Sequence, residues 1–233
     1  MNLILGPDNL SIEFDFSFEE ANIKLQKKYN NIGLYFSGGI DSTALLLVII
    51  NELIKTEKIN QLPIHCFTIK KKDFATDNSI KVLEKIKNKF NVDIEHTNHI
   101  PNYKNLEYDL ATPLLTRLYL ENKNTLFFTG INKMPSEDLV KFKNKLNLHY
   151  GYFKDRGLYY SPFLYMNKAQ ILDIFYKFDC SDILEYTYSC TSHPNIPCGD
   201  CYSCEERAWG FEMLHKIDPL LPKTHLQQID IRI

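Results

Sequence analysis

Hydrophobic and polar positions along the chain follow two spacings, one typical of buried strands and one typical of helices. Short apolar runs bounded by turn residues predict strands at 31–36, 64–69, 93–97 and 125–129. Apolar positions three or four residues apart predict helices at 18–29, 41–55, 77–90, 109–121, 136–146 and 167–178. This alternation predicts an α/β fold, in which helices cover both faces of a doubly wound parallel sheet.

Two features lie outside this alternation. Apolar and polar residues alternate from Leu10 to Phe16, so we expect the segment 1–18 to form a hairpin or an edge strand. Asn167 stands where the helix 167–178 would begin, and asparagine is a favoured N-cap residue. We expect an α/β domain over 1–180 and a smaller C-terminal module over 181–233.

The composition is that of an ordinary soluble globular protein. Of the 233 residues, 44% are hydrophobic and 24% are charged. The net charge of −2 gives no global attraction to nucleic acid or anionic membranes, so a nucleic-acid partner is not expected. No signal peptide is visible, and the longest apolar run, 44–50, is shorter than the about 20 residues that span a bilayer. We therefore expect a cytoplasmic protein with reduced thiols.

A glycine-rich loop follows the first buried strand and leads into the helix 41–55. It reads Ser37-Gly38-Gly39-Ile40-Asp41-Ser42-Thr43. Ligands of doubly wound sheets bind beyond the carboxyl ends of the strands. Glycines let the backbone approach a ligand, and the free N–H groups at the start of the helix attract anions. The loop therefore predicts a site for an anion of pyrophosphate size, with an ordinary capped turn as the alternative.

Asp41 is the unusual residue of this loop, because a carboxylate repels phosphate unless a cation lies between them. It could hold Mg²⁺, cap the helix, or do both. The loop lacks the Walker A pattern and the dinucleotide pattern G-x-G-x-x-G. It resembles the PP-loop of the ATP pyrophosphatase superfamily, whose members form AMP esters and release pyrophosphate. The resemblance implies that ATP and Mg²⁺ bind at Ser37, Gly38, Gly39, Asp41, Ser42 and Thr43.

Four of the six cysteines crowd into one segment near the C-terminus. They are Cys190, Cys198, Cys201 and Cys204, with the spacing C-x7-C-x2-C-x2-C. In a reduced compartment this clustering favours metal over disulfides. Four thiolates complete a closed tetrahedron around Zn²⁺, so we expect a structural zinc site, with an iron–sulfur cluster or redox thiols as alternatives. His193 could replace one ligand, while Cys66 and Cys180 fit packing positions better.

The two motifs together resemble 7-cyano-7-deazaguanine synthase. The segments 188–190 and 198–207, followed by Phe211, are similar to the zinc segment of that family, which also has an S-G-G-x-D-S loop. The resemblance implies a ligase that uses ATP and ammonia to turn 7-carboxy-7-deazaguanine into the nitrile preQ0. Residues 162–164, which lead to Lys168, fit a weaker signpost of the family. Lys168, at the start of a predicted helix, could then contact phosphate or substrate, with a solvated lysine as the alternative. Asp41 and Lys168 are the candidate catalytic residues.

Two stretches, 70–73 and 133–138, depart from the family where the acceptor substrate should sit. Arg117, on a predicted helix, could pair with a carboxylate in the site. Glu137 and Asp138 could bind Mg²⁺ or begin a helix. The resemblance is therefore stronger for the ATP-binding residues than for the residues that would bind the acceptor. The chain could be a divergent paralogue that activates a different carboxylate.

Three functions fit these observations. The first is an ATP-dependent ligase that adenylates a carboxylate on a 7-deazaguanine-like substrate and converts it with ammonia to an amide or nitrile. The second is a PP-loop thiolase or amidating enzyme that acts on tRNA or a small molecule, and the third is a non-catalytic nucleotide-binding partner subunit. The first reading requires ATP, Mg²⁺ and Zn²⁺, and leaves open a homodimer or a partner protein.

Overall fold

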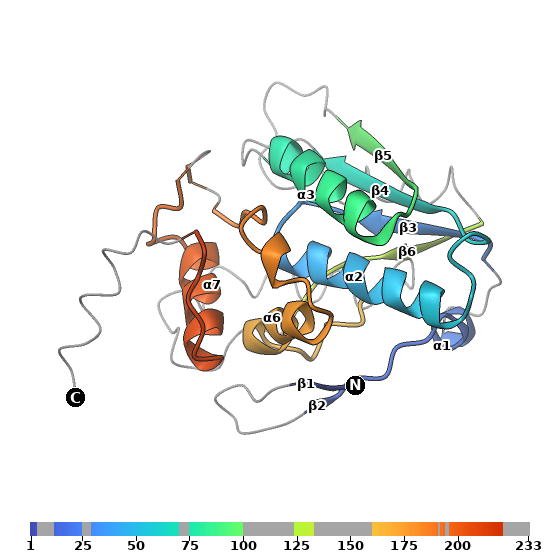
Figure 1. Ribbon diagram of the computed structural model, residues 1–233, viewed down its shortest axis with the longest axis horizontal. Coiled ribbons are helices and arrows are strands. Elements are labelled where there is room, and N and C mark those ends of the chain that lie inside the picture. The colour runs from blue at the N-terminus through green and yellow to red at the C-terminus, as the bar shows by residue number, and fades with distance from the viewer. Residues whose placement is uncertain are drawn as a thin grey trace.

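A parallel sheet of four strands, in the order β5-β4-β3-β6, organises the computed structural model (Figure 1). The structure describes residues 1–3, 12–24, 29–69, 75–99, 124–132, 160–190, 192–193 and 196–220. The strands are β3 (Asn31–Tyr35), β4 (Ile64–Ile69), β5 (Ile94–His99) and β6 (Thr125–Phe128). The chain moves outward from β3 to β5 and returns to the other side of β3 as β6. The predicted α/β fold with a parallel sheet is confirmed, and the reversal of strand order is that of a doubly wound topology, with its switch point at the β3/β6 edge.

Helix α2 (Ile40–Lys55) lies between the sheet and helix α6 (Lys168–Lys177), and α3 (Ala75–Phe90) lies on the same face of the sheet as α2 (Figure 1). Because α2 has neighbours on two sides, it is buried along nearly its whole length, from Ile40 to Leu53. That explains why its sequence is apolar almost all round, as expected for a helix inside a core. Asn167 caps α6 as predicted, in a reciprocal capping box with Gln170.

The N-terminal segment forms the predicted hairpin, in which β1 (Asn2–Leu3) pairs antiparallel with β2 (Ile12–Glu13). Helix α1 (Phe18–Lys24) follows. An aromatic cluster attaches this segment to the domain: Phe16 packs against Phe18, Phe128 and Tyr160 at centroid distances of 5.4, 5.7 and 6.3 Å. In the described part of the chain, no helix is both long and apolar enough to cross a membrane.

Helix α7 (Tyr202–Met213) and the short 3-10 helix η2 (Ser181–Ile183) were not predicted from the sequence. The reason for missing α7 is physical. Its buried face contains the charged residues Glu206 and Arg207, so no apolar stripe marks the helix in the sequence. The helices expected at 109–121 and 136–146, the stretches 70–73 and 133–138, and Arg117 lie outside the described residues.

A buried ion pair fixes the segment that follows α7. Arg207 donates two hydrogen bonds to Asp218, from Nε at 2.7 Å and from Nη2 at 2.8 Å. The same guanidinium donates to the carbonyl and hydroxyl oxygens of Thr187 and to the carbonyl oxygen of Leu184. Because both charged side chains are almost fully buried, each needs the other in order to stay charged in the interior.

Replacing Asp218 by Asn should therefore destabilise the protein by about 3 kcal/mol, because it leaves the buried Arg207 without its carboxylate. Asp182→Asn is the matched control: Asp182 pairs with Lys89 at the similar distance of 2.7 Å, but its side chain is 65% exposed. That change should cost about 1 kcal/mol or less. Chemical denaturation of both variants checks the difference, and equal losses of stability would contradict it.

Candidate functional site

The predicted loop connects β3 to α2 at the carboxyl end of the sheet, beside the switch point. Gly38 has a φ of +74°, and a Cβ atom there would lie 2.6 Å from the backbone nitrogen of Ser79 in α3. Both facts require glycine at this position. Gly130, after β6, is constrained by close approach alone, because its Cβ would lie 2.9 Å from the backbone carbon of Asp41. The two strand ends therefore meet at the first turn of α2.

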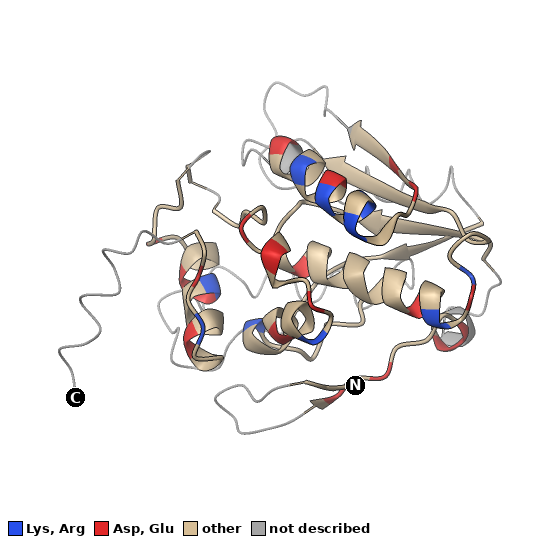
Figure 2. Cartoon of the chain, in the orientation of Figure 1, with Lys and Arg blue, Asp and Glu red and all other residues tan. Residues whose placement is uncertain are grey.

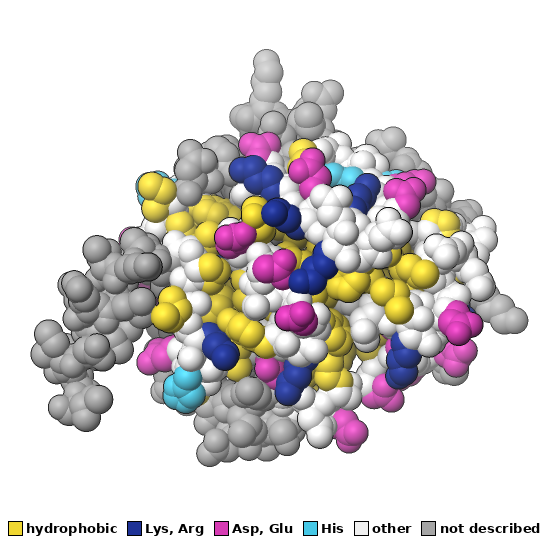
Figure 3. Space-filling model, viewed as in Figure 1, with side chains coloured by type: hydrophobic (Ala, Val, Ile, Leu, Met, Phe, Trp, Pro, Cys, Tyr) yellow, Lys and Arg dark blue, Asp and Glu magenta, His cyan; other side chains and the backbone are white. Residues whose placement is uncertain are grey.

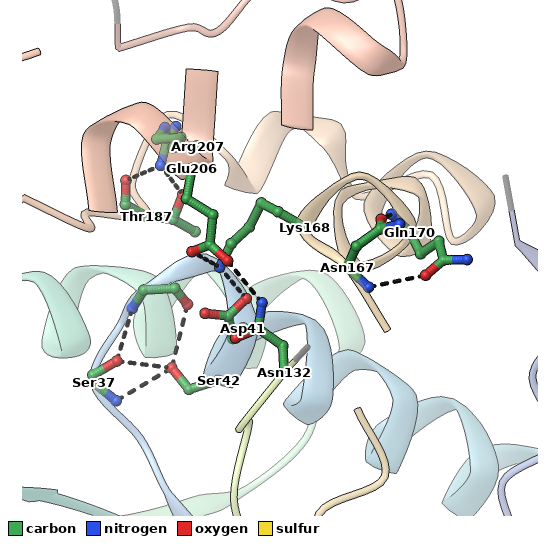
Figure 4. Close-up of polar contacts among 11 residues, drawn as sticks. Ser37, Asp41, Ser42, Asn132, Asn167, Lys168, Gln170, Thr187, Glu206 and Arg207 are labelled. Atoms are coloured by element: carbon green, nitrogen blue, oxygen red, sulfur yellow. Dashed lines mark hydrogen bonds and ion pairs between the residues drawn. The ribbon is translucent and has the colours of Figure 1, made fainter. Parts of the chain in front are cut away.

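Serine hydroxyls shape the loop from within (Figure 4). Ser42 Oγ donates to the carbonyl oxygen of Gly39 at 3.2 Å and accepts from the backbone N–H of Ser37 at the same distance. Ser37 Oγ accepts from the N–H of Gly39 at 3.3 Å. Ser37 is exposed, whereas Thr43 is fully buried and its Oγ1 has no hydrogen-bond partner among the described residues. Ser37 thus lies at the exposed surface of the loop, while Ser42 holds the turn together.

Lys168 lies beside this loop, although 127 residues separate it from Asp41 (Figure 4). Its ammonium donates a short hydrogen bond to Asp41 Oδ1 and lies 3.0 Å from Glu206 Oε2 of α7. Glu206 also accepts from Asn132 Nδ2, at 2.9 Å, through its other oxygen. The side chain of Lys168 is 4% exposed, which rules out the alternative of a solvated lysine. Asp41 does not act as a side-chain cap, because the N-cap of α2 is Gly39.

The electrostatics of this group follow from burial and pairing. Burial alone would lower the pKa of Lys168, but the charges and hydrogen bonds of Asp41 and Glu206 outweigh it and raise that pKa. Burial raises the pKa of Glu206, and Lys168 and Asn132 oppose that rise. Lys168 is therefore a permanent cation between two acids, at the edge of a loop suited to phosphate.

Close packing of α6 and α7 brings these groups together. Gly210 of α7 lies so near α6 that a Cβ there would be 2.8 Å from side-chain atoms of both Leu172 and Lys168. Asn167 caps α6 directly before Lys168 and so fixes where that side chain begins. The approach of the two helices places Glu206 of α7 within reach of Lys168.

The four clustered cysteines converge as the spacing predicted. Their sulfur atoms all lie within 4.8 Å of one another, with 3.6 Å between Cys190 and Cys198 and 3.9 Å between Cys198 and Cys204. A tetrahedral zinc ion with Zn–S bonds of about 2.3 Å requires sulfur atoms about 3.8 Å apart. The backbone N–H groups of His193 and Cys201 donate to the sulfur atoms of Cys190 and Cys198. The donor set fits a single thiolate-bound metal ion.

The pKa values of these thiols show why a cation suits the cluster. Burial opposes ionisation of Cys190, but hydrogen bonds from neighbouring backbone N–H groups and from Cys198 lower its pKa to about 6. Burial raises the pKa values of Cys198 and Cys204. Without a cation, four thiolates this close would repel one another, so the full set ionises only around a metal. Cys66 and Cys180 are buried in the core, away from the cluster, as predicted.

The cysteine segment and the loop are in direct contact. The backbone N–H of Tyr188 donates to the carbonyl oxygen of Gly38 at 3.2 Å. A Cβ on Gly39 would lie 3.4 Å from the carbonyl oxygen of Tyr188. The predicted loop residues and the predicted cysteines, far apart in sequence, therefore belong to neighbouring parts of the same surface. Sequence reasoning missed Glu206, although a glutamate next to a matched arginine in the cysteine segment was the available signal.

The family match lies in the C-terminal half of the chain. The family "Queuosine biosynthesis protein QueC" matches residues 137–215. A 7-cyano-7-deazaguanine synthase of Chromobacterium violaceum is 31% identical over 68 residues, which are 29% of each chain. One of Methanosarcina barkeri is 33% identical over 86 residues, covering 33% of this chain and 36% of the relative. The matches thus span about a third of the length of these relatives.

A solved structure, the U34-tRNA thiolase NcsA of Methanococcus maripaludis with its [4Fe-4S] cluster, is also similar in shape. The TM-score is 0.47 at 14% identity, and the match covers 92% of this chain and 80% of that one. This likeness is too weak to carry an argument. The family match has a firmer basis, since residues 137–215 include Lys168, Glu206 and the four cysteines. Residues 137–215 are therefore similar to the QueC family, and stretches of the chain are similar to two 7-cyano-7-deazaguanine synthases.

Proposed function

We propose that this protein is an ATP-dependent ligase that adenylates a carboxylate on a 7-deazaguanine-like substrate and converts it with ammonia to an amide or nitrile. The observation that carries the proposal is the meeting of Asp41, Lys168 and the glycine loop at the switch point of the sheet. Clefts at such points bind nucleotides in doubly wound folds. The QueC match over 137–215 supports the substrate class.

In this proposal the loop binds the phosphates of ATP, and Asp41 and Lys168 act on the reacting groups. Mg²⁺, held by Asp41, would supply charge neutralisation between phosphate and carboxylate. A substrate carboxylate oxygen attacks the α-phosphorus, and pyrophosphate leaves. Ammonia then attacks the acyl carbon, so that AMP leaves and an amide and a proton form. Lys168 stabilises the negative charge that develops on phosphate, chiefly by its fixed position. A second ATP would drive loss of water from the amide to give a nitrile.

We assign the four-cysteine site to a structural zinc ion bound by Cys190, Cys198, Cys201 and Cys204. The short distances between the sulfur atoms support one ion over an iron–sulfur cluster, which places several atoms between its cysteines. A closed set of four thiolates leaves no position for substrate, so the site would stabilise the 181–233 module without taking part in the reaction.

The alternative of a thiolase receives less support. Sulfur transfer would need a reactive cysteine outside the metal site, and the remaining two, Cys66 and Cys180, are buried. Burial raises the pKa of both thiols, that of Cys180 to about 11, so neither is an activated nucleophile. Over the described part of the face in Figure 3, basic and acidic side chains alternate, and Figure 2 shows both signs along α3. That mixture offers no basic field to tRNA there.

Other features stay predictions from the sequence. They are the division into 1–180 and 181–233, a cytoplasmic location, and assembly as a homodimer or with a partner protein. The acceptor also stays open, because the stretches 70–73 and 133–138 depart from the family. We propose a carboxylate or amide on a purine-like heterocycle, which is not necessarily the acid that the family uses.

The protein should cleave ATP between the α and β phosphates, giving AMP and pyrophosphate. Asp41→Asn should lower kcat at least about 100-fold, because it removes a fixed charge from the reacting centre. Asp77→Asn is the matched control, since Asp77 also lies in the first turn of a helix but is exposed. Chromatography of the nucleotides formed with 7-deazaguanine carboxylates, Mg²⁺ and ammonium measures both effects. ADP and phosphate as products would overturn the assignment.

The purified protein should contain about one zinc ion per chain. Cys201→Ser should reduce the metal content and lower the melting temperature, because metal binding contributes folding free energy. In the control Cys180→Ser, the new hydroxyl can still donate to the carbonyl oxygen of Phe178, and zinc should stay bound. Elemental analysis and thermal melts test this pair. Iron with acid-labile sulfide in place of zinc would show that the cluster alternative is correct.

A further inference from the structure

Glu206 is a buried acid for which the proposed chemistry has no role. It lies on α7, the helix that also contains Cys204, and its side chain is 7% exposed. Its two oxygens are divided between Lys168, at 3.0 Å, and Asn132, at 2.9 Å. Burying a second carboxylate beside Asp41 is unfavourable in itself, so its presence calls for a compensating role.

We propose that Glu206 is a positioning residue for the ATP site. It keeps Lys168 paired and in place while Asp41 turns from that lysine to Mg²⁺. This inference rests on the proposed function, because it assumes that ATP and Mg²⁺ bind at the loop. Through α7, the segment that contains the four cysteines would then help to set the geometry of the phosphate site.

In the structure one ammonium faces two carboxylates, those of Asp41 and Glu206 (Figure 4). A buried ammonium must keep a partner, because an unpaired charge in the interior is strongly unfavourable. With Glu206 present, Lys168 stays paired when Asp41 leaves it. Without Glu206, Lys168 has Asp41 as its remaining carboxylate and competes with Mg²⁺ for it.

The position of Glu206 is itself tightly fixed. The next residue, Arg207, is anchored by Asp218 and Thr187. Cys204 of the four-cysteine site lies two residues before Glu206. On the same helix, Gly210 allows close contact with α6. The helix therefore cannot rotate or slide without breaking one of these contacts, and the carboxylate of Glu206 stays directed at Lys168.

The test compares Glu206→Gln with Glu212→Gln in the full-length protein. Both remove one negative charge from α7, but Glu212 is exposed. Two quantities are measured: binding of ATP without Mg²⁺, by equilibrium dialysis, and the Mg²⁺ concentration that gives half-maximal pyrophosphate release. For E206Q we expect ATP binding without Mg²⁺ to be retained and the Mg²⁺ requirement to rise about tenfold. Glu206→Asp, which keeps the charge, should restore part of the loss.

A merely structural role predicts a different result, in which ATP binding and melting temperature fall together with activity. That outcome, or a Mg²⁺ titration of E206Q that matches E212Q, would overturn the inference. Labelling of Lys168 with an amine-reactive reagent, followed by mass spectrometry, gives a readout that needs no ATP. Lys168 should be protected in the wild type and E212Q, and several-fold more reactive in E206Q.

The labelling also separates the two proposals. If the wild type neither binds ATP nor releases pyrophosphate, the proposed function fails. In that case, increased labelling of Lys168 in E206Q would still show that Glu206 holds it, whereas the inferred effect on Mg²⁺ would fall with the function. If the wild type is active and labelling of Lys168 is unchanged in E206Q, the inference about Glu206 is wrong and the proposed function stands.

Discussion

The burial of Lys168 is the constraint on which the arrangement of the site depends. The ammonium of a lysine whose side chain is 4% exposed must be surrounded by acids and hydrogen-bond acceptors, and no single helix supplies them. The structure recruits Asp41 from α2 and Glu206 from α7, and Asn132 after β6 holds Glu206 in turn. One side chain of α6 therefore ties together the sheet, the glycine loop and the cysteine module. A site built in this way is ordered before any ligand arrives, which is what positioning of phosphate requires.

The site also depends on close approach between backbone segments, which glycine allows at three contacts around it. Gly38 and Gly130 let the loops after β3 and β6 pack against α3 and α2, and Gly210 lets α7 approach α6. A side chain at any of the three would meet neighbouring atoms at 2.9 Å or less. The charged cluster can form because these contacts bring its members within hydrogen-bonding distance. Electrostatic pairing and backbone packing thus depend on each other.

Strands, the central helices and the chemistry-bearing motifs could be predicted because each has a local signature. The run 64–69 and the cap at Asn167 were correct to the residue, since apolar periodicity and capping depend on near neighbours. Helix α7 could not be predicted from local periodicity, because its buried face is charged. The charged residues of that face pair with Asp218 and Lys168, which lie outside the helix. The role of Glu206 was hidden for the same reason. A buried glutamate looks like a surface one until its partner is known.

The position of the four-cysteine segment indicates a role that its composition alone does not indicate. The four-cysteine cluster lies at the start of the helix that supplies Glu206, and the preceding segment bonds to Gly38 of the loop. Under the proposed zinc assignment, removing the ion would therefore loosen contacts on two sides of the glycine loop at once. Folding free energy from metal binding at the cysteines would in this way also hold Glu206 and Lys168 in place. That coupling would explain why a structural metal lies beside the glycine loop instead of at the far end of the domain.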